Sequence, residues 1–443
     1  MTIDLSPDAA PIGPSELADA WPVLSLEERL EGFRLLPRPE AEDFFLSLPA
    51  RDQAELLLAL PASDRRSWIR LVPPDDAADV IQASPPEHRD GLLALLDWTT
   101  RVEVTALLAY AEDAAGGLMN PRYARLRPEM TVDEAIRYLR RQVREQLGTI
   151  YYLYVIDADR RLLGVASLHQ LFAAPPERKV RDIMRTDVVT VPEQMDQEAV
   201  SRLFAQHDLI AIPVVDADGR MKGIVTVDDI VDVVQEEATE DIQKIGGTEA
   251  LEAPYLEVGF AELLRKRAGW LSVLFLGEML TASAMAGFED EIARAVVLAL
   301  FVPLIISSGG NSGSQASTLV IRAMALGEVR LRNWWRVLRR EAFSGLALGL
   351  ILGLGGLARV LAWEWLFRAY GEHYVLIGLT VAASLVGVVL FGTMTGAMLP
   401  FVLRRLGFDP ASASAPFVAT VVDVTGLVIY FTVAMLILGG VLL

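Results

Sequence analysis

The chain has 443 residues, of which 52% are hydrophobic, and its mean hydropathy of +0.35 is high for a soluble protein. We therefore expect two or more domains, with one in a membrane. The formal net charge of -18 is uneven: residues 1–262 hold 26 basic and 48 acidic residues, whereas residues 263–443 hold 14 and 10. An acidic soluble part argues against nucleic acid as a partner and favours cations.

Two further features of the composition exclude common kinds of site. Cysteine is absent, which excludes disulfides and thiolate metal sites, and only four histidines are present, far apart in the sequence. The N-terminus lacks a basic segment followed by an apolar one, so no signal peptide is evident and we expect the chain to start in the cytoplasm.

Prolines recur every twelve residues in the first part of the chain, at positions 37, 49, 61, 73 and 85. Because proline suits the first turn of a helix and stops the helix before it, residues 1–118 are predicted to form a stack of short helices. Asp75 and Asp79 would share a face of one such helix. A cation between them, or an interaction of the acids with the helix dipole, would explain the pair.

Residues 119–235 contain an internal repeat with an offset of 59 residues: Tyr154–Asp159 matches Pro213–Asp218, and Leu163–Leu168 matches Lys222–Val227. Each copy is predicted to contain a helix, a strand, an Asp-x-Asp turn, a second strand and another helix. The pattern resembles tandem CBS domains, which often bind adenine nucleotides through a Thr/Ser-x-Asp element. Thr226 and Asp228 occupy that element here, although Asp228 as a helix cap is an equally good interpretation.

An acidic run follows the repeat, and its carboxylates are predicted to fall on one helix that continues through a connector at residues 236–262. They are Asp228, Asp229, Asp232, Glu236, Glu237, Glu240 and Asp241. A solvated helix face would explain such a run. Alternatively, divalent cations bridge these carboxylates to another acidic surface, such as Asp75 and Asp79, because Mg2+ prefers hard oxygen ligands.

Five apolar stretches are long enough to span a membrane, near residues 268–288, 295–321, 342–366, 375–403 and 411–443. The loop at residues 322–341 carries six arginines. Placing this loop inside puts the N-terminal domains in the cytoplasm and the C-terminus outside.

Asp423 is the single charged residue of the last stretch, and a carboxylate at that depth needs water, an ion or a partner. We expect it to line an ion path, with a helix-packing aspartate as the alternative. The second stretch is rich in glycine and polar residues from Ser307 to Gln315, and Asn311 is a natural neighbour of Asp423. Glu278 in the first stretch is a second intramembrane acid, for which packing is the simpler role.

These motifs together resemble the MgtE family of magnesium channels and transporters. The resemblance is carried by Gly116–Met119, the CBS pair, Ser308–Gln315, Gly396–Pro400 and Pro416–Gly426. It implies a homodimer in the inner or plasma membrane, with one Mg2+ pore at the dimer axis and closure by intracellular Mg2+ bound to the acidic cytosolic domains. ATP is implied as a further regulatory ligand.

The resemblance also implies roles for individual residues. It places Asp423, Asn311, Ala419 and Thr420 around the pore ion and Asp409 at the cytoplasmic mouth. It assigns the regulatory ions to Asp75 and Asp79 together with the acidic run.

The expected fold is thus a helical domain at 1–118, an α/β tandem CBS region at 119–235, a connecting plug helix at 236–262 and an all-α membrane domain of five helices at 263–443. The expected function is Mg2+ transport without enzymatic activity. An ion-coupled carrier of Mg2+ or Co2+ is the main alternative, and a membrane-anchored nucleotide sensor is a third class that leaves Asp423 unexplained.

Overall fold

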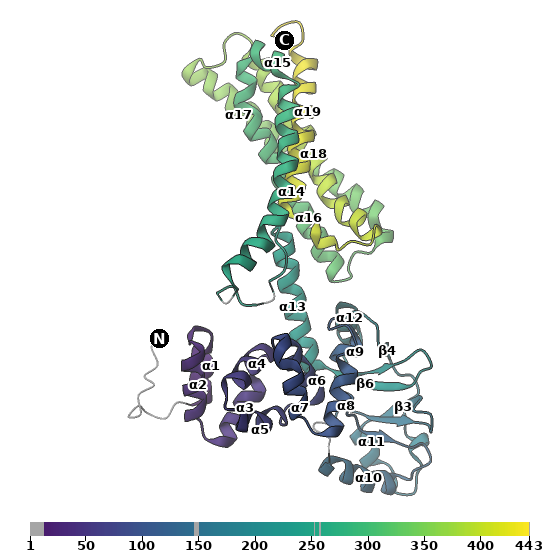
Figure 1. Ribbon diagram of the computed structural model, residues 1–443. Helices are drawn as coiled ribbons and strands as arrows, with labels where there is room; N and C mark the ends of the chain where they lie inside the picture. The colour runs from purple at the N-terminus through teal and green to yellow at the C-terminus, as the bar shows by residue number, and fades with distance from the viewer. Residues whose placement is uncertain (1–12, 146–149, 252, 257, 443) are drawn as a thin grey trace. The chain divides into compact units, whose positions relative to one another are not determined.

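The computed structural model describes residues 13–145, 150–251, 253–256 and 258–442 (Figure 1). The chain divides into two compact units, Met1–Val234 and Gln235–Leu443, which are described separately. The first contains the helical array and both α/β modules, and the second contains all the long apolar helices that the structure describes.

The first unit begins with a run of short helices, drawn in purple to dark blue in Figure 1. Their bounds are α1 (Pro14–Ala20), η1 (Trp21–Val23), α2 (Leu26–Leu35), α3 (Arg38–Ser47), α4 (Ala50–Ala59), α5 (Ala62–Ile69), α6 (Pro74–Ala83), α7 (Pro86–Leu95) and α8 (Trp98–Leu107). The five periodic prolines are the residues that cap α3 to α7, each with φ between -52° and -55°. The predicted stack of short helices is confirmed.

Apolar side chains hold this array together and join it to the second α/β module. Phe33, Phe45 and Trp68 pack with ring centroids 4.9–6.4 Å apart. The same buried cluster continues through Ile81 of α6 to Ile212 and Ile230 of the second module. Helix α6 and the start of the acidic helix therefore belong to one core.

Two small sheets form the repeat. Their elements are α9 (Ala115–Leu118), β1 (Arg125–Leu126), α10 (Val132–Glu145), β2 (Leu153–Ile156), β3 (Leu162–Ala166), α11 (Leu168–Ala173), η2 (Val180–Asp182), β4 (Val191–Pro192), α12 (Gln197–His207), β5 (Ala211–Val215) and β6 (Met221–Thr226). In each sheet the middle strand pairs in parallel with the first strand and antiparallel with the third. The predicted duplication is confirmed.

The hairpin turns of the two modules meet. Leu162 N donates to Gly219 O at 3.1 Å, and Met221 N donates to Arg160 O at 2.9 Å. In each turn one aspartate accepts bonds from backbone N–H groups two and four residues later: Asp157 from Asp159 and Arg161, and Asp216 from Asp218 and Arg220. The Asp-x-Asp signal therefore marks side-chain-stabilised turns.

The acidic run lies on one helix, α13 (Val227–Ile245), as expected. The helix nevertheless ends at Ile245, whereas the predicted connecting helix extends over residues 236–262. It stops before Gly246 and Gly247, and Gly247 has φ +76°, a conformation that favours glycine and ends the helix. The next helix begins at Phe260.

The second unit contains five described helices that are long and apolar enough to cross a membrane. The helical elements are α14 (Phe260–Ala286), α15 (Glu289–Arg294), η3 (Val296–Phe301), α16 (Val302–Ala325), η4 (Leu331–Asn333), α17 (Trp334–Phe367), α18 (Tyr374–Arg405), η5 (Pro410–Ser412) and α19 (Ala415–Leu438). The five predicted spans are confirmed, and the last helix is shorter than the apolar stretch. Figure 1 shows these helices running alongside one another.

Helices α16 and α18 approach each other through glycines on both sides. A Cβ at Gly392 would collide with the carbonyl oxygen of Gly309, and one at Gly396 would collide with that of Gly313. On another face of α18, a Cβ at Gly349 of α17 would lie 2.8 Å from the Cα of Val386. Small residues at helix crossings are the usual means of close packing in membranes.

We predict that Gly396→Ala destabilises the second unit, because the added methyl group cannot be accommodated against backbone. An overpacked core position costs about 1–3 kcal/mol. Gly355→Ala on α17 is the matched control, since nothing lies within 4 Å of its Cβ position. Thermal unfolding of the detergent-solubilised protein, followed by tryptophan fluorescence, should give a lower midpoint for Gly396→Ala only. Equal midpoints for the two variants would contradict the close approach of α16 and α18.

Candidate functional site

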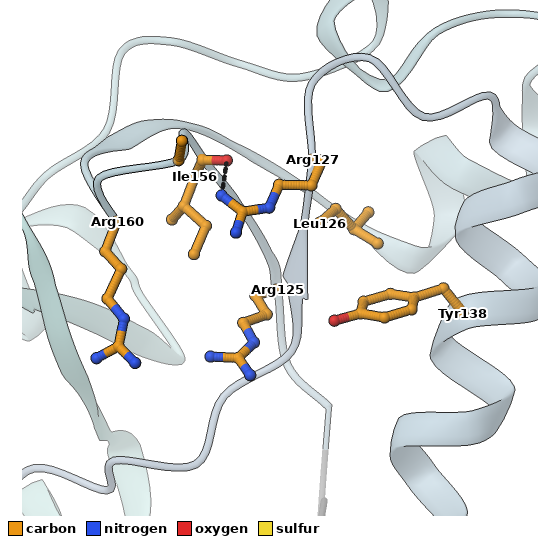
Figure 2. A pocket seen from close by; sticks show the side chains of 7 residues that line it. Arg125, Leu126, Arg127, Tyr138, Ile156 and Arg160 are labelled. Carbon is orange, nitrogen blue, oxygen red and sulfur yellow. Dashed lines mark hydrogen bonds between the residues drawn. The ribbon is translucent and has the colours of Figure 1, made fainter.

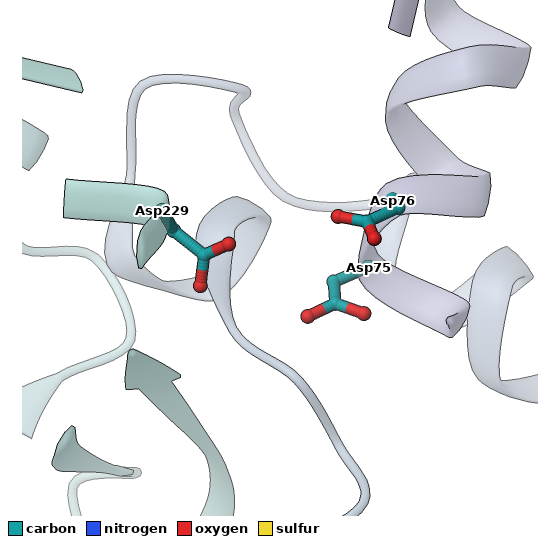
Figure 3. Close-up of side chains that lie close together, drawn as sticks. All are labelled: Asp75, Asp76 and Asp229. Carbon is teal, nitrogen blue, oxygen red and sulfur yellow. The ribbon is translucent and has the colours of Figure 1, made fainter. Parts of the chain in front are cut away.

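Three carboxylates from two helices gather in the first unit. Asp75 and Asp76 lie in the first turn of α6, and Asp229 lies in the first turn of α13. Each offers an oxygen within 4.8 Å of the oxygens of the others, and Figure 3 shows the three carboxylates facing one another. Asp75 is buried, with 7% of its surface exposed, and the other two are half-buried.

The hydrogen-bond partners of this cluster are neutral. Asn120 Nδ2 donates to Asp75 Oδ1 at 3.0 Å, while the hydroxyl and backbone N–H of Thr226 donate to Asp229 Oδ2 at 2.6 and 3.3 Å. Within the described part of the chain, no lysine or arginine forms an ion pair with any of the three. The negative charges are therefore left without a protein cation.

Burial and mutual repulsion raise the pKa of every carboxyl group in the cluster. Burial, followed by the charges of Asp76 and Asp229, raises the pKa of Asp75 well above its usual range. Burial also raises the pKa of Asp76, with Asp228 and Asp232 adding to the effect, and burial raises the pKa of Asp229 to about 7. Such a cluster is able to take up protons, and its oxygens could hold a divalent cation in their place.

The predicted regulatory residues are thus brought together in part. Asp75 and Asp229 are in the cluster, and Asp228 and Asp232 are near enough for their charges to act on Asp76. Asp76, which was not predicted, is the third member of the cluster, and the predicted role of Asp79 on the same helix stays a prediction. The cluster also shows that Asp229, and not Asp228, bonds to Thr226 at the helix start. The positions of Asp76 and Asn120 depend on the docking of α6 onto the second module, for which the sequence pattern gave no signal.

The remaining residues of the acidic run lie in the second unit, where a lysine joins two of the predicted acids. Lys244 forms ion pairs with Glu240, one turn earlier on α13, and with Asp409 at 2.6 Å. Asp409 also accepts a bond from the N–H of Ala411 at 2.8 Å and so caps η5. Glu236, Glu237 and Asp241 lie on the same helix. The role of Lys244 was missed because no helix periodicity connects residues 244 and 409.

Asp423 lies on α19, half-buried, at the level where α14 and α16 contact that helix. A Cβ at Gly310 of α16 would lie 3.4 Å from Cβ of Ala419 and 3.8 Å from Asp423 Oδ1. A Cβ at Gly277 of α14 would lie 2.5 Å from Cγ2 of Thr420. Glycines on two neighbouring helices thus bring their backbones close to the helical turn that carries Asp423.

A polar stripe on α16 is exposed on the surface of the second unit, beginning at the level of Asp423. Its members recur at three- and four-residue spacing: Ser307, Asn311, Gln315 and Thr318. Asn311 Nδ2 donates to Ser307 Oγ at 3.3 Å. A shallow hollow of about 430 Å³ is lined by Ser314, Gln315, Thr318 and Leu319. Gly310, the residue before Asn311, thus lies close to Asp423, and the pairing of Asn311 with Asp423 stays a prediction.

Comparison with known proteins decides the family. Family models match residues 302–433 as a divalent cation transporter domain (MgtE), 12–113 as the MgtE intracellular N domain, and 115–177 and 180–236 as CBS domains. The chain is 47% identical over 347 residues to the magnesium transporter MgtE of Thermus thermophilus, a match covering 78% of this chain and 75% of the relative. The chain belongs to the MgtE family of magnesium transporters.

Further relatives agree. The magnesium transporters MgtE of Bacillus subtilis and Enterococcus faecalis are 35% and 33% identical, each over 75% of this MgtE chain and 71% of the relative. Among solved structures, a crystal structure of the cytosolic domain of the Mg2+ channel MgtE in complex with ATP is 44% identical. It covers 50% of this chain and 90% of that chain, with a TM-score of 0.47. The prediction of a transporter rather than an enzyme is confirmed.

The raised pKa values predict that the metal-free protein loses stability as pH rises. The carboxyl group of Asp229 has its usual pKa of 3.8 in the unfolded chain and about 7 in the folded one. Between these values the folded state holds a proton that the unfolded state has released, so the free energy of unfolding falls from about pH 4 to pH 7.

Asp229→Asn should flatten this dependence, because it removes the carboxyl group that takes up the proton. The amide oxygen still accepts the bonds from Thr226, so the helix start is preserved. Calorimetry of the protein in EDTA from pH 5 to pH 8 provides the measurement. For a unit of this size the midpoint falls by about 2–4 °C per kcal/mol lost. Asp90→Asn, on an exposed helix position, is the control. The same downward slope in Asp229→Asn and in the unaltered protein would refute the assignment.

Proposed function

We propose that this protein is a Mg2+ channel of the plasma membrane, whose path follows α16 and α19 and closes when cytosolic Mg2+ binds the acidic cluster. The observation that carries the proposal is the outward-facing polar stripe on α16 beside Asp423. In a bilayer, such groups need water or protein on that side, because lipid satisfies none of their hydrogen bonds.

A homodimer supplies what the stripe needs. If two copies face each other across an axis along α16 and α19, the stripes enclose a wet path and two Asp423 carboxylates give it a charge of about -2. This charge favours a divalent over a monovalent ion. Mg2+ releases its water slowly, so carboxylate, amide and backbone oxygens around Asn311, Ala419 and Thr420 would contact it through its hydration shell.

Orientation follows from charge in the loops. The arginines of residues 322–341 and the pair Arg404–Arg405 belong on the cytoplasmic side, which places the first unit in the cytoplasm and the C-terminus outside. Asp409 then lies near the cytoplasmic mouth, where it forms an ion pair with Lys244. Import down the electrical gradient is the favoured direction for a cation.

Closure follows from the cluster in the first unit. A divalent ion among Asp75, Asp76 and Asp229 cancels the repulsion between α6 and the start of α13. Without the ion, the repulsion between these helix ends opposes the apolar packing that joins α6 to the start of α13 and favours a state in which they move apart, so cytosolic Mg2+ selects the closed state by binding it more tightly. The acidic residues further along α13 would transmit this change toward the membrane.

A nucleotide at the CBS pair has less support in the geometry. ATP is bound in the solved MgtE cytosolic domain, and Thr226 and Asp228 are the residues predicted to contact it here. Thr226 is only 8% exposed, and its hydroxyl already donates to Asp229. These contacts favour a helix cap at Thr226.

Removing the charge of Asp423 should stop transport. Asp423→Ala and Asp423→Asn are expected to lower Mg2+ flux into proteoliposomes by about ten-fold or more, since ten-fold corresponds to 1.4 kcal/mol and the loss of a path charge exceeds this. Glu372→Gln, in an exposed loop, controls for expression and insertion. Flux in Asp423→Ala equal to that of the control would exclude Asp423 from the path. Flux that requires a proton or sodium gradient would instead support the carrier.

Neutralising the cluster should weaken closure and leave conduction intact. In Asp75→Asn/Asp76→Asn, the internal Mg2+ concentration that halves the current is expected to rise about ten-fold, because two of three ligating carboxylates lose their charge. Patch recordings with graded internal Mg2+ measure this shift, with Glu87→Gln on exposed α7 as control. An unshifted inhibition curve would refute closure through this cluster.

A further inference from the structure

A basic cavity in the first CBS module is not used by the function proposed above. It has a volume of about 260 Å³ and is lined by Arg125, Leu126, Arg127, Tyr138, Ile156, Ala158 and Arg160 (Figure 2). Residues 1–262 carry 48 acidic side chains, yet none of the residues that line this cavity in the described part of the chain is acidic. We propose that the cavity binds a compact phosphate group, either as inorganic phosphate or as the phosphate of a small metabolite, between Arg125 and Arg160.

The polar side chains of the cavity are arranged as hydrogen-bond donors. Figure 2 shows the guanidinium groups of Arg125 and Arg160 directed into the same space, with the hydroxyl of Tyr138 pointing toward Arg125. Tyr138 Oη already accepts a bond from Gln142 Nε2 at 3.2 Å, which leaves its proton free to be donated. A set made only of donors, two of them cationic, matches a group with several acceptor oxygens and negative charge.

Arg125 and Arg160 are also the arginines of the cavity whose charge is not used within the chain. Among the described residues, neither forms an ion pair with a carboxylate. Arg127 differs, because its guanidinium donates to the carbonyl oxygens of Ile156 and Asp157. Arg127 therefore braces the turn, while the two other arginines repel each other until an anion lies between them.

The backbone at Arg160 gives an independent reason to assign it a role. Arg160 has φ +66°, in the left-handed region that disfavours residues with a Cβ. The equivalent residue of the second module, 59 positions later, is Gly219, with φ +76°. The same turn is thus made by glycine in the second module and, in the first, by an arginine whose guanidinium faces the cavity. A side chain retained at a strained position indicates a role for that side chain.

The cavity is distinct from the position predicted for an adenine nucleotide. It lies at the turn end of the β2–β3 hairpin, beside Ala158, whereas Thr226 ends β6 away from the turn that precedes that strand. The volume accommodates a phosphate group with a small organic part, and bidentate arginine contacts suit a phosphate. The cavity is also separate from the carboxylate cluster of the same unit.

The test uses the full-length protein in detergent, titrated calorimetrically with inorganic phosphate and, separately, with glycerol phosphate and ATP. Arg160→Gly is the decisive variant, because it removes the guanidinium and replaces it with the residue that the second module has at this turn. It should fold at least as well as the unaltered protein. We expect its affinity for phosphate to fall at least ten-fold, with an equal loss in Arg125→Gln and an unchanged thermal midpoint in Arg160→Gly.

Arg220→Gln provides the matched control, since Arg220 is on the neighbouring turn but does not line the cavity. Its affinity should stay within two-fold of the unaltered protein. Tighter binding of glycerol phosphate than of inorganic phosphate would identify a metabolite as the source of the group. No binding at 10 mM phosphate, binding retained in Arg160→Gly, an equal loss in Arg220→Gln, or binding of ATP alone would each overturn the proposal.

Discussion

Carboxylates that are partly withdrawn from water without a basic partner are the constraint on which both halves of this protein depend. In the first unit, Asp75, Asp76 and Asp229 face one another, and the described residues offer them only neutral hydrogen-bond donors. In the second, Asp423 lies among apolar helices. Burying a charge is costly unless an opposite charge compensates it, so both places favour a cation that the polypeptide itself does not provide. In the function proposed here, one of these sites serves conduction of Mg2+ and the other serves its sensing.

The packing around these carboxylates determines how strongly each site favours a cation. Glycines at 309, 313, 392 and 396 let α16 and α18 approach until their backbones touch, and Gly310 and Gly277 bring α16 and α14 against the turn that carries Asp423. In the first unit, one apolar core runs from the helical array into the second module and fixes the ends of α6 and α13 near each other. Repulsion between aspartates is therefore maintained by burial of apolar surface, which supplies most of the folding energy. The core resists this repulsion and keeps the carboxylates close together. For that reason an ion can act on the cluster.

Much of this architecture was predictable from the sequence, because it is encoded in periodic signals. The twelve-residue proline period gave the helical array, the 59-residue repeat gave the two modules, and apolar length gave the five spans. The residues that meet at the sites were less predictable. The part of Asp76 in the cluster and the bridge from Lys244 to Asp409 depend on how separate elements dock, and the bond of Thr226 to Asp229 depends on where the helix starts. On a helix, neighbouring residues point to different faces, so a shift of one residue in where a helix starts changes which side chain faces the site. The local sequence carries no signal for that choice.

The two CBS modules show how one fold can hold opposite electrostatics. Their sheets, registers and aspartate-stabilised turns are the same, so the differences lie in individual side chains. The second module ends in Thr226 and Asp229, which join a carboxylate cluster, whereas the first ends in Ser167 and Gln170, which bond to each other across a helix start without charge. At the turn the contrast reverses, with Arg160 in the first module and Gly219 in the second. The turns of the two modules contact each other. An anion held by the first module would therefore lie in the same unit as the carboxylate cluster, to which the second module contributes Asp229. If both proposed sites are occupied, the duplicated scaffold holds ligands of both signs in one compact unit, which would be a physical basis for coupling a second signal to the Mg2+ response.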